Sequence, residues 1–150
     1  MVRGKWVLAA LLGSMVGMAA SQAFAQADVI EKRQQLMKGQ SAAAKAIKGA
    51  VESKDYATVE TKAKDLMGSS AKIVDHFPKG STTGKTKATA AIWDKSEDFA
   101  KNAKNLKNAA SDLADAAKAK NDDAVSTKVK AVAATCDSCH KEFRAAKYSE

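Results

Sequence analysis

The chain has 150 residues, which suits a single domain, and a formal net charge of +8 from 25 Lys and Arg against 17 Asp and Glu. The lysines are spread along the chain and are not interleaved with aromatic residues, so nucleic-acid binding has little support. A positive field could steer the protein toward an acidic protein partner or an anionic membrane surface. A solvated, lysine-rich helical face explains the same charge.

Residues 1–25 have the pattern of a signal peptide. Arg3 and Lys5 supply a positive start, and residues 6–20 form an uncharged apolar run. Residues 23–25 (AFA) then place small side chains at the two positions that a signal peptidase recognises. An uncleaved membrane anchor is disfavoured because the run is shorter than the roughly 20 residues that span a bilayer.

We predict cleavage after Ala25, with a cut after Ala27 as the alternative, because both sites follow the same small-residue rule. The expected product is an exported, periplasmic protein of residues 26–150 without a transmembrane segment. Loss of the two basic residues of the leader leaves 23 basic against 17 acidic residues, a formal charge of +6.

Residues 28–148 are expected to be helical, because their apolar residues recur at intervals of three and four. The first helix ends at a polar turn at 53–55, and the second runs over 56–77 until Pro78 stops it. The inward stripe of the first helix consists of Val29, Arg33, Leu36, Met37, Gln40, Ala44, Ile47 and Val51. No strand pattern competes.

A long loop is predicted at 78–88 (PKGSTTGKTKA), which contains a proline, two glycines and several Ser and Thr residues. The third helix covers 92–117, and the fourth covers 125–143. Asn121 can cap the fourth helix by accepting a hydrogen bond from a free backbone donor.

Four helices with two short links and one longer loop predict an all-α, antiparallel up-down-up-down four-helix bundle. Alanine is abundant at its inward positions, so the apolar area available for burial, at roughly 25 cal/mol per Å², is modest. A large apolar cofactor between the helices would supply the missing contacts.

The stretch TCDSCHKEFR at 135–144 contains both cysteines of the chain and one of its two histidines. On a helix Cys136, Cys139 and His140 share one face. A disulfide is disfavoured because cysteines three apart in a regular helix rarely match its geometry. A thiol redox pair needs a strand before the motif, and a zinc site needs more ligands than this. Covalent haem attachment needs only two thiols and an adjacent imidazole.

A CxxCH motif in the last helix, followed by Phe143 and Arg144, resembles the cytochrome c′ family, and most closely its low-spin cytochrome c-556 type. The resemblance extends over EKRQQLMKGQ, HFPKGS, AIW and CDSCHKEFR, in this order. It implies a four-helix bundle around one haem c, bound covalently by Cys136 and Cys139, with His140 as the proximal iron ligand. It also places Arg144 near the imidazole or a propionate, although an exposed cation at a helix end is the alternative.

In this family the residue on the distal side of the haem follows an arginine by four positions. In RQQLM the arginine is Arg33 and the distal residue is Met37. A thioether is a good axial ligand in electron-transfer cytochromes, so we expect Met37 to bind iron. The alternative is a methionine that only packs over it. Arg33 is expected either to contact a propionate or to be a surface charge.

Four further residues have simpler expected roles. We expect His76 to be an exposed loop histidine and Met67 to be a packing residue. Trp93 and Phe99 are expected to line the haem pocket or the core.

The expected function is that of a periplasmic c-type cytochrome, which transfers single electrons through a haem with His/Met ligation. The alternative is a high-spin cytochrome c′ that binds NO or CO at an open distal site. A third hypothesis is a helical protein without haem, whose CxxCH binds a metal or forms a disulfide. Enzyme activity is not expected, because two histidines and no convergent carboxylates offer little acid–base chemistry. Expected partners are a redox protein, acidic or membrane-associated, and a second copy of the chain bound through the first two helices.

Overall fold

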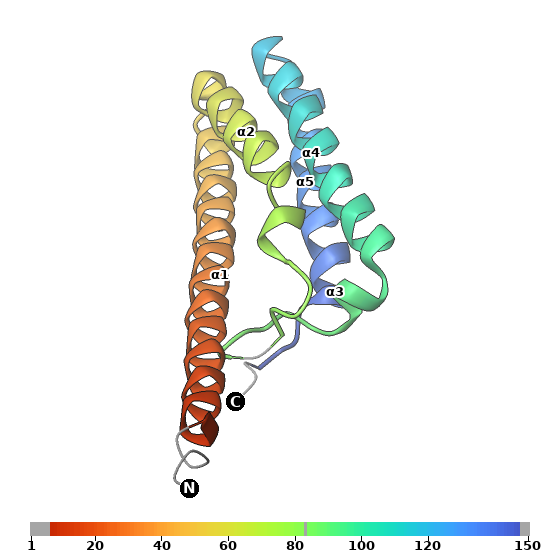
Figure 1. The fold of residues 1–150 in the computed structure, drawn as a ribbon. Coiled ribbons are helices and arrows are strands. Elements are labelled where there is room, and N and C mark those ends of the chain that lie inside the picture. Colours follow the sequence, from red (N-terminus) through yellow and green to blue (C-terminus); the bar gives the residue numbers. More distant parts are fainter. Residues whose placement is uncertain (1–6, 83, 148–150) are drawn as a thin grey trace, which may run out of the picture.

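The computed structural model describes residues 7–82 and 84–147, and of residues 7–26 it describes the backbone alone. The described residues form four long helices, one short helix and one 3-10 turn: α1 (Val7–Glu52), α2 (Tyr56–Ser70), η1 (Val74–His76), α3 (Ala91–Asp94), α4 (Ser96–Lys118) and α5 (Asp122–Phe143). The long helices alternate in direction (Figure 1). The predicted all-α four-helix bundle is therefore confirmed. Within the described part, pairing of the β type is limited to one isolated bridge between Ala88 and Arg144.

The long helices pack in chain order. Helix α1 packs along α2, α2 along α4, and α4 along α5, whereas α1 and α5 touch each other only sparsely. Figure 1 shows α1 along one side of the bundle and α4 and α5 along the other. The bundle therefore has a loosely closed seam between its first and last helices.

The predicted signal peptide lies where the structure describes at most the backbone. Residues 1–6 lie outside the described residues, and the side chains of 7–26 are not described. Cleavage after Ala25 or Ala27 stays a prediction. Among the residues that the structure describes, no helix is both long and apolar enough to cross a membrane.

Capping residues define the starts of α2 and α5. The Asp55 carboxylate accepts a hydrogen bond from the Thr58 backbone N–H at 3.1 Å, and the Asn121 side chain accepts one from Ala124 N–H at 2.9 Å. Each bond satisfies one of the free N–H groups in the first turn of a helix. The predicted cap at Asn121 is confirmed.

The two short links between helices meet at one end of the bundle. Lys54 Nζ lies 2.5 Å from Asp122 Oδ2, and the Tyr56 hydroxyl donates to Asp122 Oδ1. These contacts join the turn after α1 to the start of α5.

The second helix is shorter than predicted. It ends at Ser70, and a turn and η1 fill the stretch before Phe77, so the prediction of a helix over 56–77 is wrong. The hydroxyls of Ser69 and Ser70 donate to Leu66 O at 3.1 and 2.5 Å. Serine and glycine at 68–70 are weak helix formers. The serine hydroxyl competes with the helix for backbone hydrogen-bonding groups, and glycine loses more backbone entropy than other residues when it becomes helical.

Two smaller predictions also need correction. The predicted third helix is divided at Lys95, where φ −120° and ψ 49° separate α3 from α4. On α1, Ala44 is exposed, and Ala43 takes the inward place with Ile47 and Ala50. The intervals 43–47–50 and 40–44–47–51 both follow the helical period, so spacing alone does not decide which of the two adjacent alanines faces the core.

The core is built from small residues with few large ones. Ala63, Ala110 and Leu113 are fully buried between α2, α4 and α5. Three phenylalanines fill the other end of the bundle, where the Phe99 ring packs edge-on against Phe77 at 5.0 Å and against Phe143 at 5.2 Å. Aromatic pairs in this arrangement stabilise a core beyond the area that they bury.

Leu113→Ala is expected to lower the free energy of unfolding by about 2–5 kcal/mol, because it removes buried methyl groups and leaves a cavity. Leu113 is 0% exposed. The measurement is urea unfolding followed by circular dichroism. Val74→Ala, at a position 44% exposed, is the control and should change the value by less than about 0.5 kcal/mol. Equal effects of the two substitutions would contradict this packing.

Candidate haem site

The CxxCH motif lies in the last two turns of α5. Cys136 and Cys139 are not disulfide-bonded, are half-buried and pack against the hydrophobic core. Burial is the main cause that raises the pKa of both thiols, and the pKa of Cys139 rises to about 11. Redox-active CxxC pairs have a lowered thiol pKa, so the thiol redox alternative loses its electrostatic basis here.

The raised pKa makes the alkylation of Cys139 slow in the folded chain before haem attachment. A thiol with a pKa of about 11 in place of 9.0 holds about a hundredfold less thiolate below pH 9, and thiolate is the form that reacts. The rate constant for iodoacetamide should rise about tenfold per pH unit up to the pKa. Mass spectrometry of the modified peptide measures it, with the chain unfolded in urea as the control. Equal rates in folded and unfolded chains would contradict the buried position.

His140 follows Cys139 directly. Partial desolvation of the imidazole lowers its pKa, the positive charge of Arg144 lowers it further, and Asp137 opposes both. The ring is therefore kept neutral near pH 7, and neutral imidazole is the form that binds metals. Arg144 is exposed and ends α5, where its backbone N–H donates to His140 O at 3.1 Å. Arg144 is thus an exposed cation at the end of the helix, as the alternative expected, and its role near the imidazole or a propionate stays a prediction.

Arg33 is buried, with 2% of its surface exposed, so the surface-charge alternative is wrong. Its Nη1 donates to Ser81 O at 3.0 Å and to Ser81 Oγ at 3.1 Å, and its Nη2 donates to Thr86 Oγ1 at 2.7 Å. The guanidinium carbon also lies 5.1 Å from the centre of the Phe77 ring. Burial lowers the pKa of Arg33, as expected for a cation removed from water.

Met37 lies on α1 one turn after Arg33. It is half-buried and packs against the same hydrophobic core as Cys136 and Cys139. Met67 also packs there, as predicted. The first helix therefore presents a methionine to the same core that receives both cysteines.

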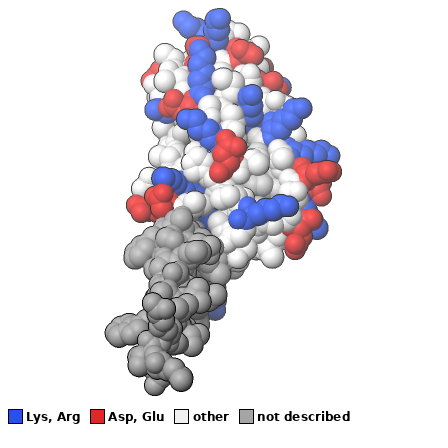
Figure 2. Space-filling view, in the orientation of Figure 1, with Lys and Arg blue, Asp and Glu red and all other residues white. Residues whose placement is uncertain are grey.

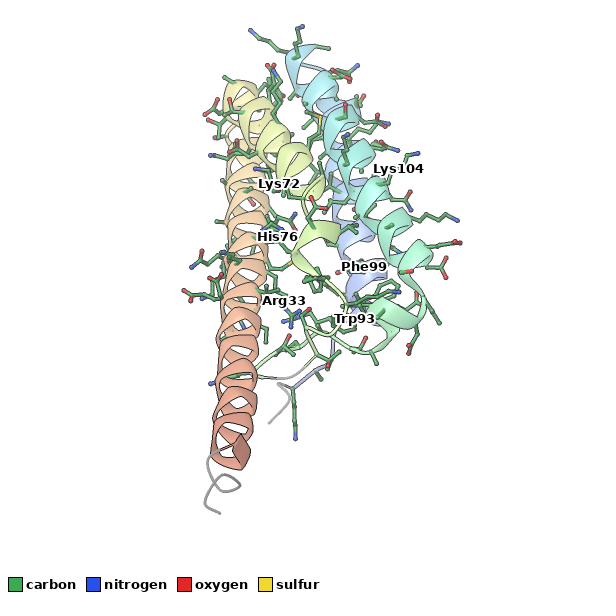
Figure 3. The ribbon with its side chains drawn as sticks, viewed as in Figure 1. Arg33, Lys72, His76, Trp93, Phe99 and Lys104 are labelled. Carbon is green, nitrogen blue, oxygen red and sulfur yellow. The ribbon has the colours of Figure 1, made fainter. Side chains whose placement is uncertain are left out.

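The other residues considered in the sequence fall at one end of the bundle. Phe99 is a core residue, and Trp93 is half-buried, with Nε1 donating to Phe77 O at 3.1 Å and Pro78 O at 3.0 Å. Figure 3 shows Arg33, Trp93 and Phe99 in this region. His76 is half-buried rather than exposed, because it belongs to η1 and its Nδ1 lies 2.8 Å from Lys72 O.

The loop at 78–89 was not identified from the sequence as part of the site. Ser81 and Thr86 are buried at 2% and 3% exposure, and they hold Arg33. The far end of the loop pairs with the end of α5, where Ala145 N–H donates to Lys87 O at 2.8 Å. Hydroxyl residues in a glycine-rich segment usually indicate solvent exposure, so the sequence carries no signal for this role.

The residues present fit a covalently bound haem. Two unbonded thiols and a neutral imidazole stand together on α5, beside a seam where α1 and α5 pack sparsely. In the part of the chain that the structure describes, no three His, Cys, Asp or Glu side chains are grouped to hold a metal ion. The zinc-site alternative therefore lacks a ligand set among these residues.

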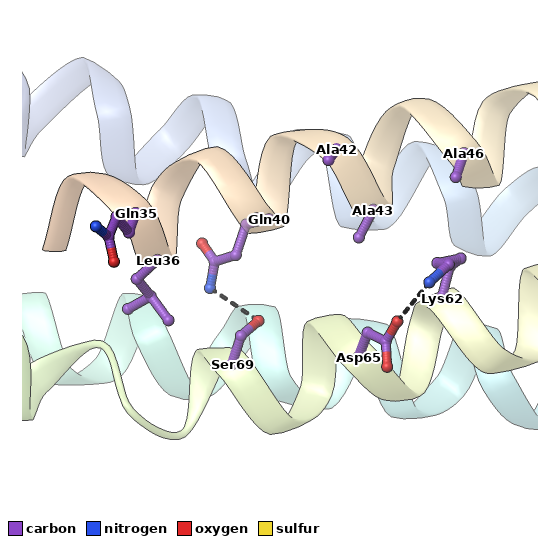
Figure 4. Close-up of a pocket in the computed structure, with 10 residues that line it drawn as sticks. Gln35, Leu36, Gln40, Ala42, Ala43, Ala46, Lys62, Asp65 and Ser69 are labelled. Atoms are coloured by element: carbon purple, nitrogen blue, oxygen red, sulfur yellow. Dashed lines mark hydrogen bonds and ion pairs between the residues drawn. The ribbon is translucent and has the colours of Figure 1, made fainter. Parts of the chain in front are cut away.

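A separate groove of about 530 Å³ lies between α1 and α2 (Figure 4). Gln40 Nε2 donates to Ser69 Oγ across it at 3.3 Å, and Lys62 pairs with Asp65 along its rim at 2.8 Å. None of the predicted haem-binding residues lines this groove.

Residues 28–144 match the protein family described as Cytochrome C'. The cytochrome c′ of Rhodospirillum rubrum is 32% identical over 146 residues, which cover 94% of this chain and 98% of that protein. The crystal structure of cytochrome c′ from Thermochromatium tepidum has a TM-score of 0.74 at 26% identity and covers 80% of this chain and 96% of that one. A nitric oxide complex of a cytochrome c prime variant from Alcaligenes xylosoxidans has a TM-score of 0.73 at 22% identity, over 81% and 97% of the two chains, which shows the shared fold. The chain belongs to the cytochrome c′ family, and membership implies a covalently bound haem c.

Proposed function

We propose that this protein carries one haem c and binds NO or CO on the distal side of that haem, the side that α1 covers. The observation that carries the proposal is the CxxCH in α5, with two unbonded thiols and a neutral imidazole, in a chain of the cytochrome c′ family. When bound, the haem supplies an iron that holds a diatomic ligand.

The residues of the chain have separate tasks in this proposal. Cys136 and Cys139 hold the cofactor through thioethers, and half-burial at the core keeps their positions fixed. His140 would hold the iron as a neutral imidazole, and Met37 would cover the opposite face of the site from α1.

Two comparisons favour gas binding over the electron carrier that we expected from the sequence. The relative at 32% identity is a cytochrome c′, and a protein of the same fold has been solved as a nitric oxide complex. Met37 packs against the core, as a gap-filling methionine does.

The His/Met electron carrier of the c-556 type remains the second candidate, and one observation favours it. Met37 lies on the inner face of α1, one turn after the buried Arg33, where the family resemblance places the distal ligand. A thioether bound to iron would block exogenous ligands.

A visible spectrum of the reduced protein with and without CO separates the two functions. Gas binding predicts a high-spin spectrum that shifts rapidly on addition of CO, and Met37→Ala should leave the spin state unchanged. A low-spin spectrum that CO does not change, and that Met37→Ala converts to a CO-binding form, would establish the carrier and contradict gas binding.

We propose export to the periplasm after removal of residues 1–25, in keeping with the apolar leader and the family. Lys, Arg, Asp and Glu side chains are mixed over the face in Figure 2, so an acidic redox partner would meet a moderate field. Homodimerisation through α1 and α2 would cover the groove between these helices. A cytochrome c′ of this fold, 27% identical with a TM-score of 0.74, is known for ligand-controlled dimer dissociation.

A further inference from the structure

Arg33 fixes the loop at 78–89 to α1. All of its hydrogen-bond partners described above are neutral oxygens of Ser81 and Thr86, and none of the ion pairs among the described residues includes it. The neighbouring Gln34 adds a contact of the same kind, since its Nε2 donates to Lys85 O at 2.8 Å. A buried guanidinium is a rigid anchor, because the planar group fixes the directions in which its N–H groups donate.

A row of aromatic rings continues from Arg33 to the haem-binding helix. The Arg33 guanidinium lies over Phe77, the Phe77 ring contacts Phe99, and Phe99 contacts Phe143. Phe143 follows His140 by three residues on α5. The row therefore connects the helix that carries Met37 to the helix that carries His140. Figure 3 labels two of its members, Arg33 and Phe99.

The loop is also tied to the end of α5 through its backbone. Thr89 N–H donates to Phe143 O at 3.2 Å, and Ala88 pairs with Arg144 in the isolated bridge. The segment thus contacts α1 through Ser81 and Thr86 and contacts α5 through residues 87–89. We call this loop, together with Arg33 and Phe77, the latch.

Two sets of contacts hold α1 on either side of Met37 along the chain. Gln40 Nε2 donates to Ser69 Oγ, on the last residue but one of α2, at 3.3 Å, and the Arg33 guanidinium donates to Ser81 and Thr86 of the loop. Direct contact between α1 and α5 is sparse. Met37 lies between these two supports, three residues before Gln40 and four after Arg33.

We propose that Arg33 is a positioning residue, which together with Phe77 latches α1 to the haem-bearing end of α5 and so sets how fast a diatomic ligand enters past Met37. The inference rests on the proposed function, because it concerns the distal side of the same haem. Interrupting the latch releases the part of α1 around Arg33 and Met37. A less restrained Met37 then covers the distal side less completely.

The test is CO recombination after flash photolysis in the holoprotein. Arg33→Met and Phe77→Leu should each raise the association rate constant by on the order of tenfold, the change that corresponds to about 1.4 kcal/mol in the barrier. Arg33→Lys should not restore the wild-type rate, because an ammonium group lacks the planar fork that reaches both loop hydroxyls. Lys38→Met removes an exposed charge from the same helix and is the matched control, with an unchanged rate.

Hydrogen exchange of the amides at 79–89 gives a readout that does not depend on ligand binding. Exchange there should accelerate in Arg33→Met and Phe77→Leu while the amides of α4 keep their wild-type protection. If Arg33→Met does not fold, Phe77→Leu and Ser81→Ala still interrupt the latch at other points.

Two results would overturn the latch. A wild-type rate in Arg33→Lys together with an altered rate in Arg33→Met would mean that charge alone matters, for example toward a propionate. Faster loop exchange with an unchanged CO rate would mean that the latch is structural only. Wild-type holoprotein that fails to bind CO would contradict the proposed function instead, and that failure is seen before any variant is made.

Discussion

Cys136→Ser combined with Cys139→Ser is expected to abolish covalent haem attachment, since a serine oxygen cannot form the thioether. Both thiols stand half-buried at the core, so any haem bound by the double variant would be held by packing and by His140 alone. Extraction with acidified acetone should move all haem of the double variant into the organic phase and leave the haem of the wild type with the protein.

The single variants are the controls for this experiment. Each keeps one thiol and should retain haem through one bond, with a visible spectrum shifted from that of the wild type. Haem that stays with the protein in the double variant would show that other side chains hold it, and the assignment of both cysteines would be wrong.

His140→Gly is expected to remove the proximal imidazole while both thioethers remain. His140 directly follows Cys139, and burial lowers its pKa, which favours the neutral imidazole that an iron ligand requires. The visible spectrum should change strongly, and the variant should bind CO with altered kinetics. Because glycine leaves space where the ring was, imidazole added to the solution should restore most of the wild-type spectrum.

Lys141→Ala is the matched control, one position further along the exposed end of the same helix. Its spectrum should equal that of the wild type. A His140→Gly protein with an unchanged spectrum, or one that imidazole does not affect, would contradict proximal ligation by His140. In that case His76, the only other histidine in the sequence, would need the same test.

Most of the fold could be predicted because its signals are local. The polar turn at 53–55 and the cap at Asn121 fall where the sequence predicts them, since a capping side chain acts within three residues. The end of α2 was predicted too late, because Pro78 is a stronger helix-ending signal than the glycine and two serines at 68–70, where the helix ends. Ending α2 early has a consequence for the site, because it places Phe77 in a turn from which its ring reaches Arg33 and Phe99.

The predicted site divides in the same way. Cys136, Cys139 and His140 form one local motif, whose chemistry depends on spacing along a single helix. The surroundings of Arg33 depend on partners 48 and 53 residues away, in a loop without a regular pattern. Sequence reasoning could select Arg33 as a candidate but could not decide between burial and exposure, because burial is a property of the packed loop.

The small side chains of the core are consistent with a bound haem, which would add apolar contacts. The small side chains of alanine at 63, 110 and 114 let α2, α4 and α5 approach closely. In contrast, α1 and α5 are in sparse contact. A covalently bound cofactor adds apolar contacts that this sequence does not provide by itself. Covalent attachment also keeps the cofactor in place when the surrounding helices move.

Intact-mass spectrometry of the wild-type protein, expressed with haem-attachment machinery and measured under denaturing, reducing conditions, tests the central claim most directly. The account predicts a single species with the mass of the processed chain plus one haem, and fragments that place the addition on the peptide with Cys136 and Cys139. A chain with the mass of the polypeptide alone, with both thiols free for alkylation, would contradict it.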